Sequence, residues 1–184
     1  RKLSKDAQWE EERFEKAKIT YSCIRVKWLN VNRVVPVGQN KASHYFTYGD
    51  PQFNSAGYAQ IVYSQLYQGA DLVFDIPVTG GVHYQFNCER GFDWHKINWQ
   101  YNPGTKLSNK QLNSFFISQG TDTIVEMGLQ VLQAGLSIPA KYLYSNNNLS
   151  IDIALNLDTS KSFVIDPFVT QINTMRSGGP GGSK

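Results

Sequence analysis

The strongest constraint on the fold is the stretch of residues 33–78, the longest region dense in strand-forming residues. Val, Ile, Tyr and Phe recur along it, and these side chains suit a pleated, half-buried sheet. Turn-forming residues interrupt it at Gly49-Asp50-Pro51, at residues 54–57 and at residues 69–71. The stretch therefore predicts short strands joined by polar loops. We expect it to hold both core residues and contacts with other subunits.

The clearest local signal is a β-hairpin. Residues 72–78 and 82–88 both have the composition of strands, and the second run alternates apolar and polar side chains. Thr79-Gly80-Gly81 lies between them and suits a tight reversal of the chain. These features predict two antiparallel neighbours in a sheet.

Other segments give weaker strand signals. Residues 58–67 alternate moderately, but Ala59, Val62 and Leu66 also fit a helical period. Pro36 limits the run around it to an edge or an end of a sheet. The remaining segments with strand-like or extended composition are residues 19–28, 31–37, 44–48, 149–157 and 163–172, the last broken by Asp166-Pro167.

Three segments predict helices. Residues 4–18 are rich in strong helix formers and carry Trp9 and Phe14 as a narrow apolar stripe, which indicates an arm docked on its own domain or on a partner. Ser108 and Gln111 have capping-box spacing and predict a short helix over residues 108–118. Thr123 and Glu126 repeat that spacing, and Gly135 is placed to end a second helix.

The fold class that follows is α+β and mainly β. We expect an antiparallel sheet or sandwich with an N-terminal helical arm and two helices in the second half. At 184 residues, 41% of them hydrophobic, the chain is long enough to bury a core without metals or disulfides. The organisation expected is a helical arm over residues 1–18, one β-rich domain over 19–176, and a flexible Gly-rich tail over 177–184.

Composition limits the partners and the compartment. The formal net charge of +3 indicates a mixed surface with at most weak nucleic-acid contact. No apolar run is long enough to span a membrane, and no signal peptide is evident. Because the chain starts at Arg1 without Met, we expect a processed or trimmed product from which a leader or anchor could be missing. Cys23 and Cys88 are expected to be reduced, with a single disulfide as the alternative.

The catalytic and metal-binding patterns are weak. His44, His83 and His95 show no metal-ligand spacing, although a dispersed site of His83, Cys88 and His95 is conceivable. An enzyme built on Cys88 with His83 or His95 is a further hypothesis, but Cys88 lies in a strand, where a thiolate has little support. Asp71 and Asp75 form a weak carboxylate pair. We therefore predict no catalytic, cofactor-binding or metal-binding residues and no enzyme.

The most aromatic segment is residues 91–104. Trp94, Trp99 and Tyr101 interleave there with Lys96, so exposed rings could stack on sugars or single-stranded nucleic acid. Trp residues near a sheet are more often core or interface anchors. Trp9, Phe14, Trp94, Lys96, Trp99 and Tyr101 are the candidate interface or binding residues.

The order of motifs resembles virus shell proteins. Residues 33–37 (RVVPV), 46–50 (FTYGD), 57–61 (GYAQI), 71–72 (DL) and 104–107 (GTKL) are similar to part of the tailed-phage and encapsulin-type major capsid proteins. Residues 91–103 resemble a strand-and-Pro segment of jelly-roll virus coats. The two resemblances imply different folds and share only the implication of a virion or shell subunit.

The function expected is therefore that of a non-enzymatic structural protein that self-assembles, such as a virus or phage capsid subunit located in the virion. Its partners would be copies of itself or other virion proteins, and it would need no cofactor. The alternative is an extracytoplasmic or virion-associated module that recognises glycans or peptides through exposed aromatic side chains. Outside a virion, the chain is expected to be soluble.

Overall fold

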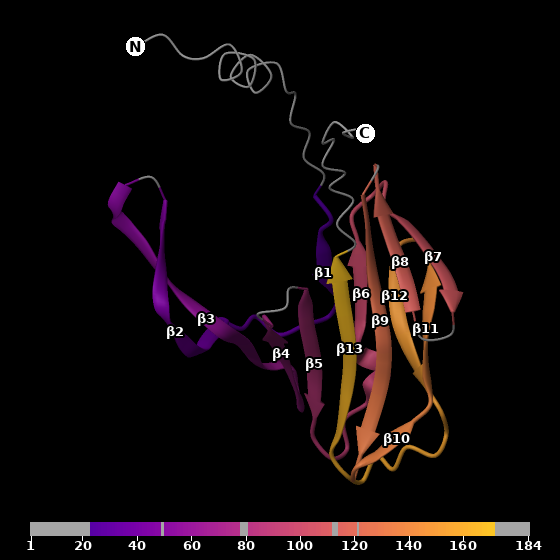
Figure 1. Cartoon of the computed structure of the whole chain (residues 1–184). Helices are drawn as coiled ribbons and strands as arrows, with labels where there is room; N and C mark the ends of the chain where they lie inside the picture. Colours follow the sequence, from indigo (N-terminus) through magenta and orange to yellow (C-terminus); the bar gives the residue numbers. More distant parts are fainter. Residues whose placement is uncertain (1–22, 49, 78–80, 112–113, 121, 172–184) are drawn as a thin grey trace, which may run out of the picture.

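The computed structural model describes residues 23–48, 50–77, 81–111, 114–120 and 122–171. Their strands form two antiparallel sheets of four and nine strands (Figure 1). The predicted helical arm, with Trp9 and Phe14, and the predicted Gly-rich tail lie outside the described residues.

The smaller sheet has the order β1-β6-β12-β11. Its central strand pair, β6 and β12, is joined by the Leu149↔Trp99 register. The strands are β1 (Val26–Trp28), β6 (Asn98–Tyr101), β11 (Ala140–Ser145) and β12 (Asn148–Ile153). A single turn of 3-10 helix, η1 (Trp94–Lys96), leads into β6.

The larger sheet has the order β2-β3-β4-β5-β13-β9-β8-β7, with β10 paired to β9. The last strand in the sequence, β13, lies in the middle of this sheet, between β5 and β9 (yellow in Figure 1). The strands are β2 (Val37–Tyr48), β3 (Asp50–Tyr67), β4 (Ala70–Asp75), β5 (Val82–Cys88), β7 (Lys106–Gln111), β8 (Ser114–Gln119), β9 (Asp122–Gln133), β10 (Leu136–Ile138) and β13 (Phe163–Gln171).

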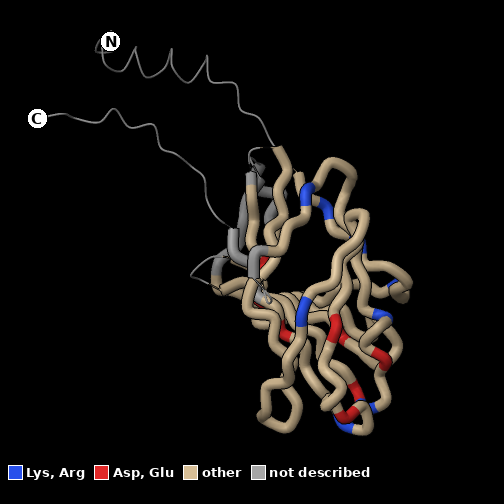
Figure 2. The backbone as a smooth tube through the Cα atoms, turned by 90° about the vertical axis from the view of Figure 1, so that its right-hand side faces the viewer, with Lys and Arg blue, Asp and Glu red and all other residues tan. Residues whose placement is uncertain are grey.

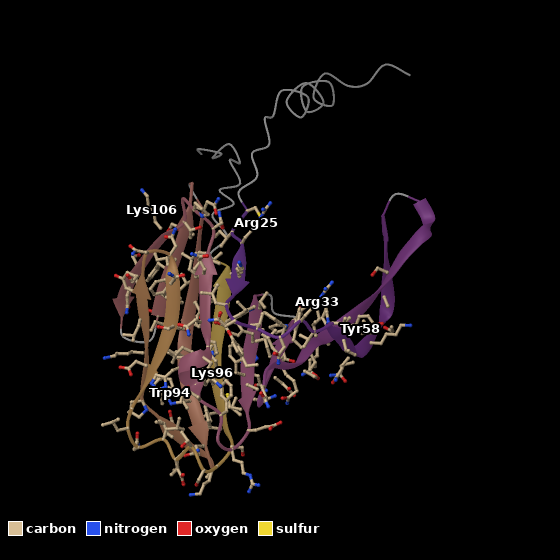
Figure 3. All side chains as sticks on the ribbon, turned by 180° about the vertical axis from the view of Figure 1, so that it is seen from behind. Arg25, Arg33, Tyr58, Trp94, Lys96 and Lys106 are labelled. Atoms are coloured by element: carbon tan, nitrogen blue, oxygen red, sulfur yellow. The ribbon has the colours of Figure 1, made fainter. Side chains whose placement is uncertain are left out.

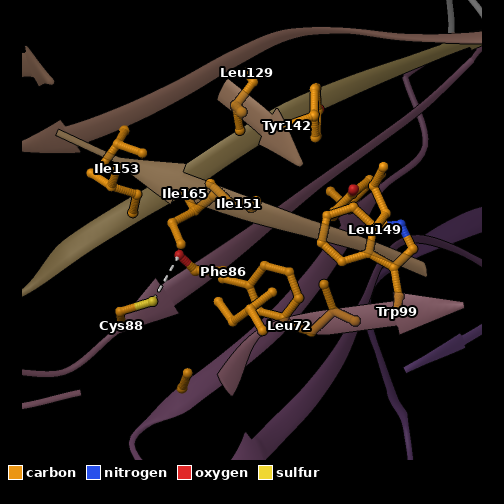
Figure 4. Close-up of a cluster of buried hydrophobic side chains, with 14 of the residues drawn as sticks. Leu72, Phe86, Cys88, Trp99, Leu129, Tyr142, Leu149, Ile151, Ile153 and Ile165 are labelled. Carbon is orange, nitrogen blue, oxygen red and sulfur yellow. Dashed lines mark hydrogen bonds between the residues drawn. The ribbon is translucent and has the colours of Figure 1, made fainter. Parts of the chain in front are cut away.

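The core lies between the two sheets, because alternate residues of each strand point inward. From the larger sheet, Phe86 and Ile165 are completely buried; from the smaller sheet, Trp99 and Leu149 are 1% exposed (Figure 4). The aromatic rings of the two sheets meet edge to face, with centroids of Trp28 and Phe86 5.1 Å apart. The fold is thus a β-sandwich held by large apolar side chains.

Several predicted strands are confirmed. β4 and β5 form the predicted antiparallel hairpin, and residues 58–67 belong to strand β3. The predicted break around Pro167 appears as a register shift between Asp166 and Phe168 in β13. The interruption predicted at residues 54–57 was wrong, because these residues continue β3.

The prediction of two helices in the second half, and with it the α+β class, was wrong. Residues 108–118 fall in β7 and β8, and the segment from Thr123 belongs to β9. Phe115 and Ile117 point into the core with a period of two, and β9 pairs with both β8 and β13. Pairing on both sides outweighs the capping-box spacing of Thr123 and Glu126, so the described residues contain no α-helix.

One hairpin leaves the sandwich. β3 pairs with β4 only from Gln60 onward, so β2 and the first half of β3 pair with each other alone. Residues 41–48 and 50–58, here called the arm, form a two-stranded ribbon that projects sideways from the sheet (Figure 1).

Candidate functional site

The arm has an open edge. β2 ends the strand order of the larger sheet, so its outer side has no strand partner in the described part of the chain. An edge strand presents unpaired N–H and C=O groups that another strand can bind. A two-stranded ribbon is also marginally stable in water on its own. The arm therefore has both the groups and the energetic reason to accept a further strand.

Apolar side chains are exposed around the base of the arm. Val37 is 56% exposed and Tyr58 is 41% exposed. The Tyr58 ring covers Gly38 so closely that a Cβ there would lie 2.5 Å from Tyr58 Cγ. Tyr58 lies away from the sandwich, where the arm begins (Figure 3). This packing holds the two strands together at the point where the ribbon leaves the sheet.

The predicted aromatic surface is divided by the fold. Trp99 and Tyr101 lie on β6 and point into the core, with 1% and 3% exposure. Trp94 is half-buried in η1 and stacks on His95, with ring centroids 3.6 Å apart, and Lys96 is exposed beside it (Figure 3). Of the four predicted binding residues that are described, only Trp94 and Lys96 are available at the surface.

Trp99 and Tyr101 instead help to line a pocket between the sheets. The pocket has a volume of about 140 Å³. Val26 and Val82, which are 45% and 39% exposed, lie at its rim, and Tyr84 is buried at its base. Its remaining wall residues are Trp28, Phe74, Ile117, Ile124 and Glu126.

Glu126 is the one acidic side chain among the described residues that line this pocket, and it is 1% exposed. Tyr84 donates a hydrogen bond to Oε1 at 2.6 Å, and Tyr101 donates to Oε2 at 3.3 Å. The Trp99 indole donates in turn to the Tyr101 hydroxyl at 3.3 Å. Burial raises the pKa of Glu126, and the tyrosine hydroxyls oppose that rise without cancelling it.

Burial also raises the pKa of the tyrosines around Glu126. The pKa of Tyr84 and that of Tyr101 are raised well above the ordinary value, first by burial and then by the nearby carboxyl. The Tyr142 hydroxyl is also buried and has no hydrogen bond of ordinary geometry, although it lies close enough to Glu126 for each to affect the other's pKa.

The predicted catalytic pairings are not assembled. His83 and Cys88 lie on opposite faces of β5, since Cys88 points into the core with Phe86 while His83 contacts Asp75 and Asp166 on the outer face. Burial raises the pKa of the Cys88 thiol and keeps it protonated. His95 contacts Asp93, with Nδ1 2.8 Å from Oδ1.

The other candidate sites are equally dispersed. Asp71 and Asp75 lie four residues apart on β4, which separates them by about 13 Å, too far for a glycosidase pair. No cluster of three or more His, Cys, Asp or Glu side chains with metal-binding geometry occurs in the described ranges. Lys and Arg occur along the side shown in Figure 2 without forming one continuous stripe.

Two features were missed by sequence reasoning. Glu126 was assigned to a helix start, yet it is an acidic residue inside the apolar run from Ile124 to Val131, a pattern that indicates a buried, hydrogen-bonded carboxyl. The arm was divided into separate short strands, because its polar residues have the composition of loops. Neither signal identifies its partners, which come from distant strands.

No helix of the described residues is long and apolar enough to cross a membrane.

Comparison with known proteins gives a family and no function. No curated protein and no solved structure gives a significant match. The model of a family described as a domain of unknown function, DUF7948, matches residues 1–168. Because that match covers most of the chain, the protein belongs to the DUF7948 family.

Proposed function

We propose that this domain is a non-enzymatic structural module that assembles with copies of itself through strand pairing at the outer edge of β2. The observation that carries the proposal is the arm, a two-stranded ribbon whose edges are both unpaired among the described residues, the β2 edge along its whole length. Pairing two arms edge to edge would turn two marginal ribbons into one four-stranded sheet.

β2 is the longest edge strand in the described part of the chain. It has 12 residues, whereas the edge strands β7 and β11 have 6 each and β1 and β10 have 3 each. Edge strands are commonly protected by Lys, by Pro or by shortness. Lys106 and Lys110 lie on β7, Pro139 and Lys141 lie at the start of β11, and β2 carries Lys41 as its one basic residue apart from His44.

A second copy is the partner that this edge fits best. Two β2 strands related by a two-fold axis can pair antiparallel, so each copy gives and receives the same surface. In a register centred on Ala42, the Ala42 residues of the two copies face each other at the axis. Lys41 then faces Ser43 of the other copy, which avoids a Lys–Lys contact. A capsid or other shell subunit would be one such assembly, and that identity remains a prediction.

The test is the molecular mass in solution of the 20.8 kDa chain, measured by light scattering over a range of concentrations. We expect a dimer or larger assembly, and Ser43→Lys should raise its dissociation constant at least about tenfold by placing a second positive charge opposite Lys41 of the other copy. Leu143→Lys, at an exposed position of β11, is the matched control and should leave the mass unchanged. A chain that stays monomeric at every concentration contradicts the proposal.

A glycan-binding or peptide-binding function is the second candidate, and the exposed η1 turn supports it. Since Trp99 and Tyr101 are buried, this reading now depends on Trp94, its stacked partner His95 and the exposed Lys96. Binding on a glycan array that is lost in Trp94→Ala would favour it. A blank array would count against it.

A further inference from the structure

The pocket between the sheets combines two properties that rarely occur together. Its walls carry the rings of Trp28, Phe74, Tyr84, Trp99 and Tyr101, and its acidic side chain is Glu126. Ring faces carry negative potential and attract cations, and a carboxylate adds a full negative charge. Among the described residues that line it, none has a basic side chain. The surface of the pocket therefore favours a positively charged group.

The aromatic rings that line the pocket pack against one another at tilted and edge-to-face angles. Trp28 and Trp99 have centroids 5.1 Å apart and an interplanar angle of 50°. Trp28 meets Tyr84 edge to face, at 5.8 Å and 69°. The rings therefore pack against one another, and both ring edges and ring faces belong to the residues that line the pocket.

The size and the opening of the pocket set the class of guest. A dry apolar cavity of about 150 Å³ accepts benzene, and the volume here is about 140 Å³. A tetraalkylammonium ion with methyl groups is comparable in size to benzene. The exposed Val26 and Val82 place the opening at the surface, where such a group can enter.

Glu126 supplies the charge that a neutral apolar pocket lacks. Its two oxygens accept one hydrogen bond each, from Tyr84 and Tyr101, and the Tyr142 hydroxyl lies nearby. A methylated ammonium ion is large and weakly hydrated, so its transfer into the pocket costs less than the transfer of a primary ammonium ion. The carboxylate can then act as its counter-ion across the pocket.

We propose that the pocket formed by Trp28, Tyr84, Trp99, Tyr101 and Glu126 is a binding site for a compact organic cation of the methylated-ammonium class. The cation would enter past Val26 and Val82, contact the ring faces and lie next to the Glu126 carboxylate. This site is in the sandwich and is independent of the arm and of self-assembly.

The test is a titration of the whole chain with tetramethylammonium chloride at constant ionic strength, followed by the NMR signal of the Trp99 indole N–H. tert-Butyl alcohol serves as the neutral comparison of similar shape. We expect saturable binding of the cation that is at least about tenfold tighter than that of the alcohol. The variant Glu126→Gln should remove this preference while its binding of the alcohol is unchanged.

Two further variants make the outcome decisive. Asp152→Asn removes the same charge from an exposed position on β12 and should bind the cation as the unmodified chain does. Val82→Trp fills the opening from a surface position and should abolish binding even if Glu126→Gln fails to fold. The proposal is overturned if the cation gives no saturable shift, if the alcohol binds equally well, or if Val82→Trp leaves binding intact.

Discussion

Replacing Glu126 by leucine tests how strongly the buried hydroxyls depend on this carboxyl. Leucine fills similar space but accepts no hydrogen bond, so Tyr84 and Tyr101 would each lose the acceptor at 2.6 Å and 3.3 Å. A buried polar group left without a partner costs about 1–3 kcal/mol. The carboxyl's own burial penalty disappears and offsets part of that loss, so we expect the free energy of unfolding to fall by about 2–4 kcal/mol.

The measurement is urea unfolding at neutral pH, arranged as a double-mutant cycle with Tyr84→Phe. In the Glu126→Leu background the Tyr84 hydroxyl has no acceptor. Tyr84→Phe should therefore lower the free energy of unfolding by less in that background than in the unmodified chain. The difference should be at least about 1 kcal/mol. Asp152→Asn, which breaks an exposed ion pair with Lys141, should change stability by less than about 0.5 kcal/mol. Equal costs of Tyr84→Phe in both backgrounds would refute the reasoning.

Two other outcomes follow from the buried titratable groups. Because the pKa of Glu126 is raised above its ordinary value of 4.5, its contribution to stability is full below about pH 4.5 and is lost as the pH rises through the folded-state pKa. Thermal unfolding measured across that pH range should show this loss of stability. Glu126→Gln, whose side chain does not titrate, should remove this pH dependence; an unchanged pH profile in that variant would contradict the assignment. In native protein, a thiol reagent should modify the exposed Cys23 quickly and the buried Cys88 only after unfolding, since burial keeps the Cys88 thiol protonated; rapid modification of both would place Cys88 at the surface.

The strands could be predicted wherever local pattern and tertiary environment agree. β4 and β5 carry alternation and are joined by a Gly-containing turn, so their pairing is visible in the sequence. β8 and β9 are different, because capping-box spacing at Ser108 and Thr123 occurs by chance in polar segments. Only the pairing partners, β7, β8 and β13, determine that these residues are strands, and a local pattern does not contain them.

The candidate sites show the same limit. Alternation places Trp99 and Tyr101 on one face of β6, but the sequence does not say whether that face meets solvent or the other sheet. The Glu126 cluster joins side chains from β5, β6 and β9, and the nearer of the two tyrosines that donate to Glu126, Tyr101, is 25 residues away in the sequence. A local pattern detects the acid in an apolar run and leaves its tyrosine partners undetermined.

The central place of β13 has a consequence for how the chain folds. Strands β2 to β5 follow one another along the larger sheet, and β7 to β9 do the same, so each group can form from contacts between neighbours in sequence. Only β13 joins the two groups, by pairing with β5 on one side and β9 on the other. During synthesis, both meanders can therefore exist before the strand that unites them has been made. The sandwich closes last, when residues 163–171 insert between them, and pairing over such long sequence separations makes that closure the slow step.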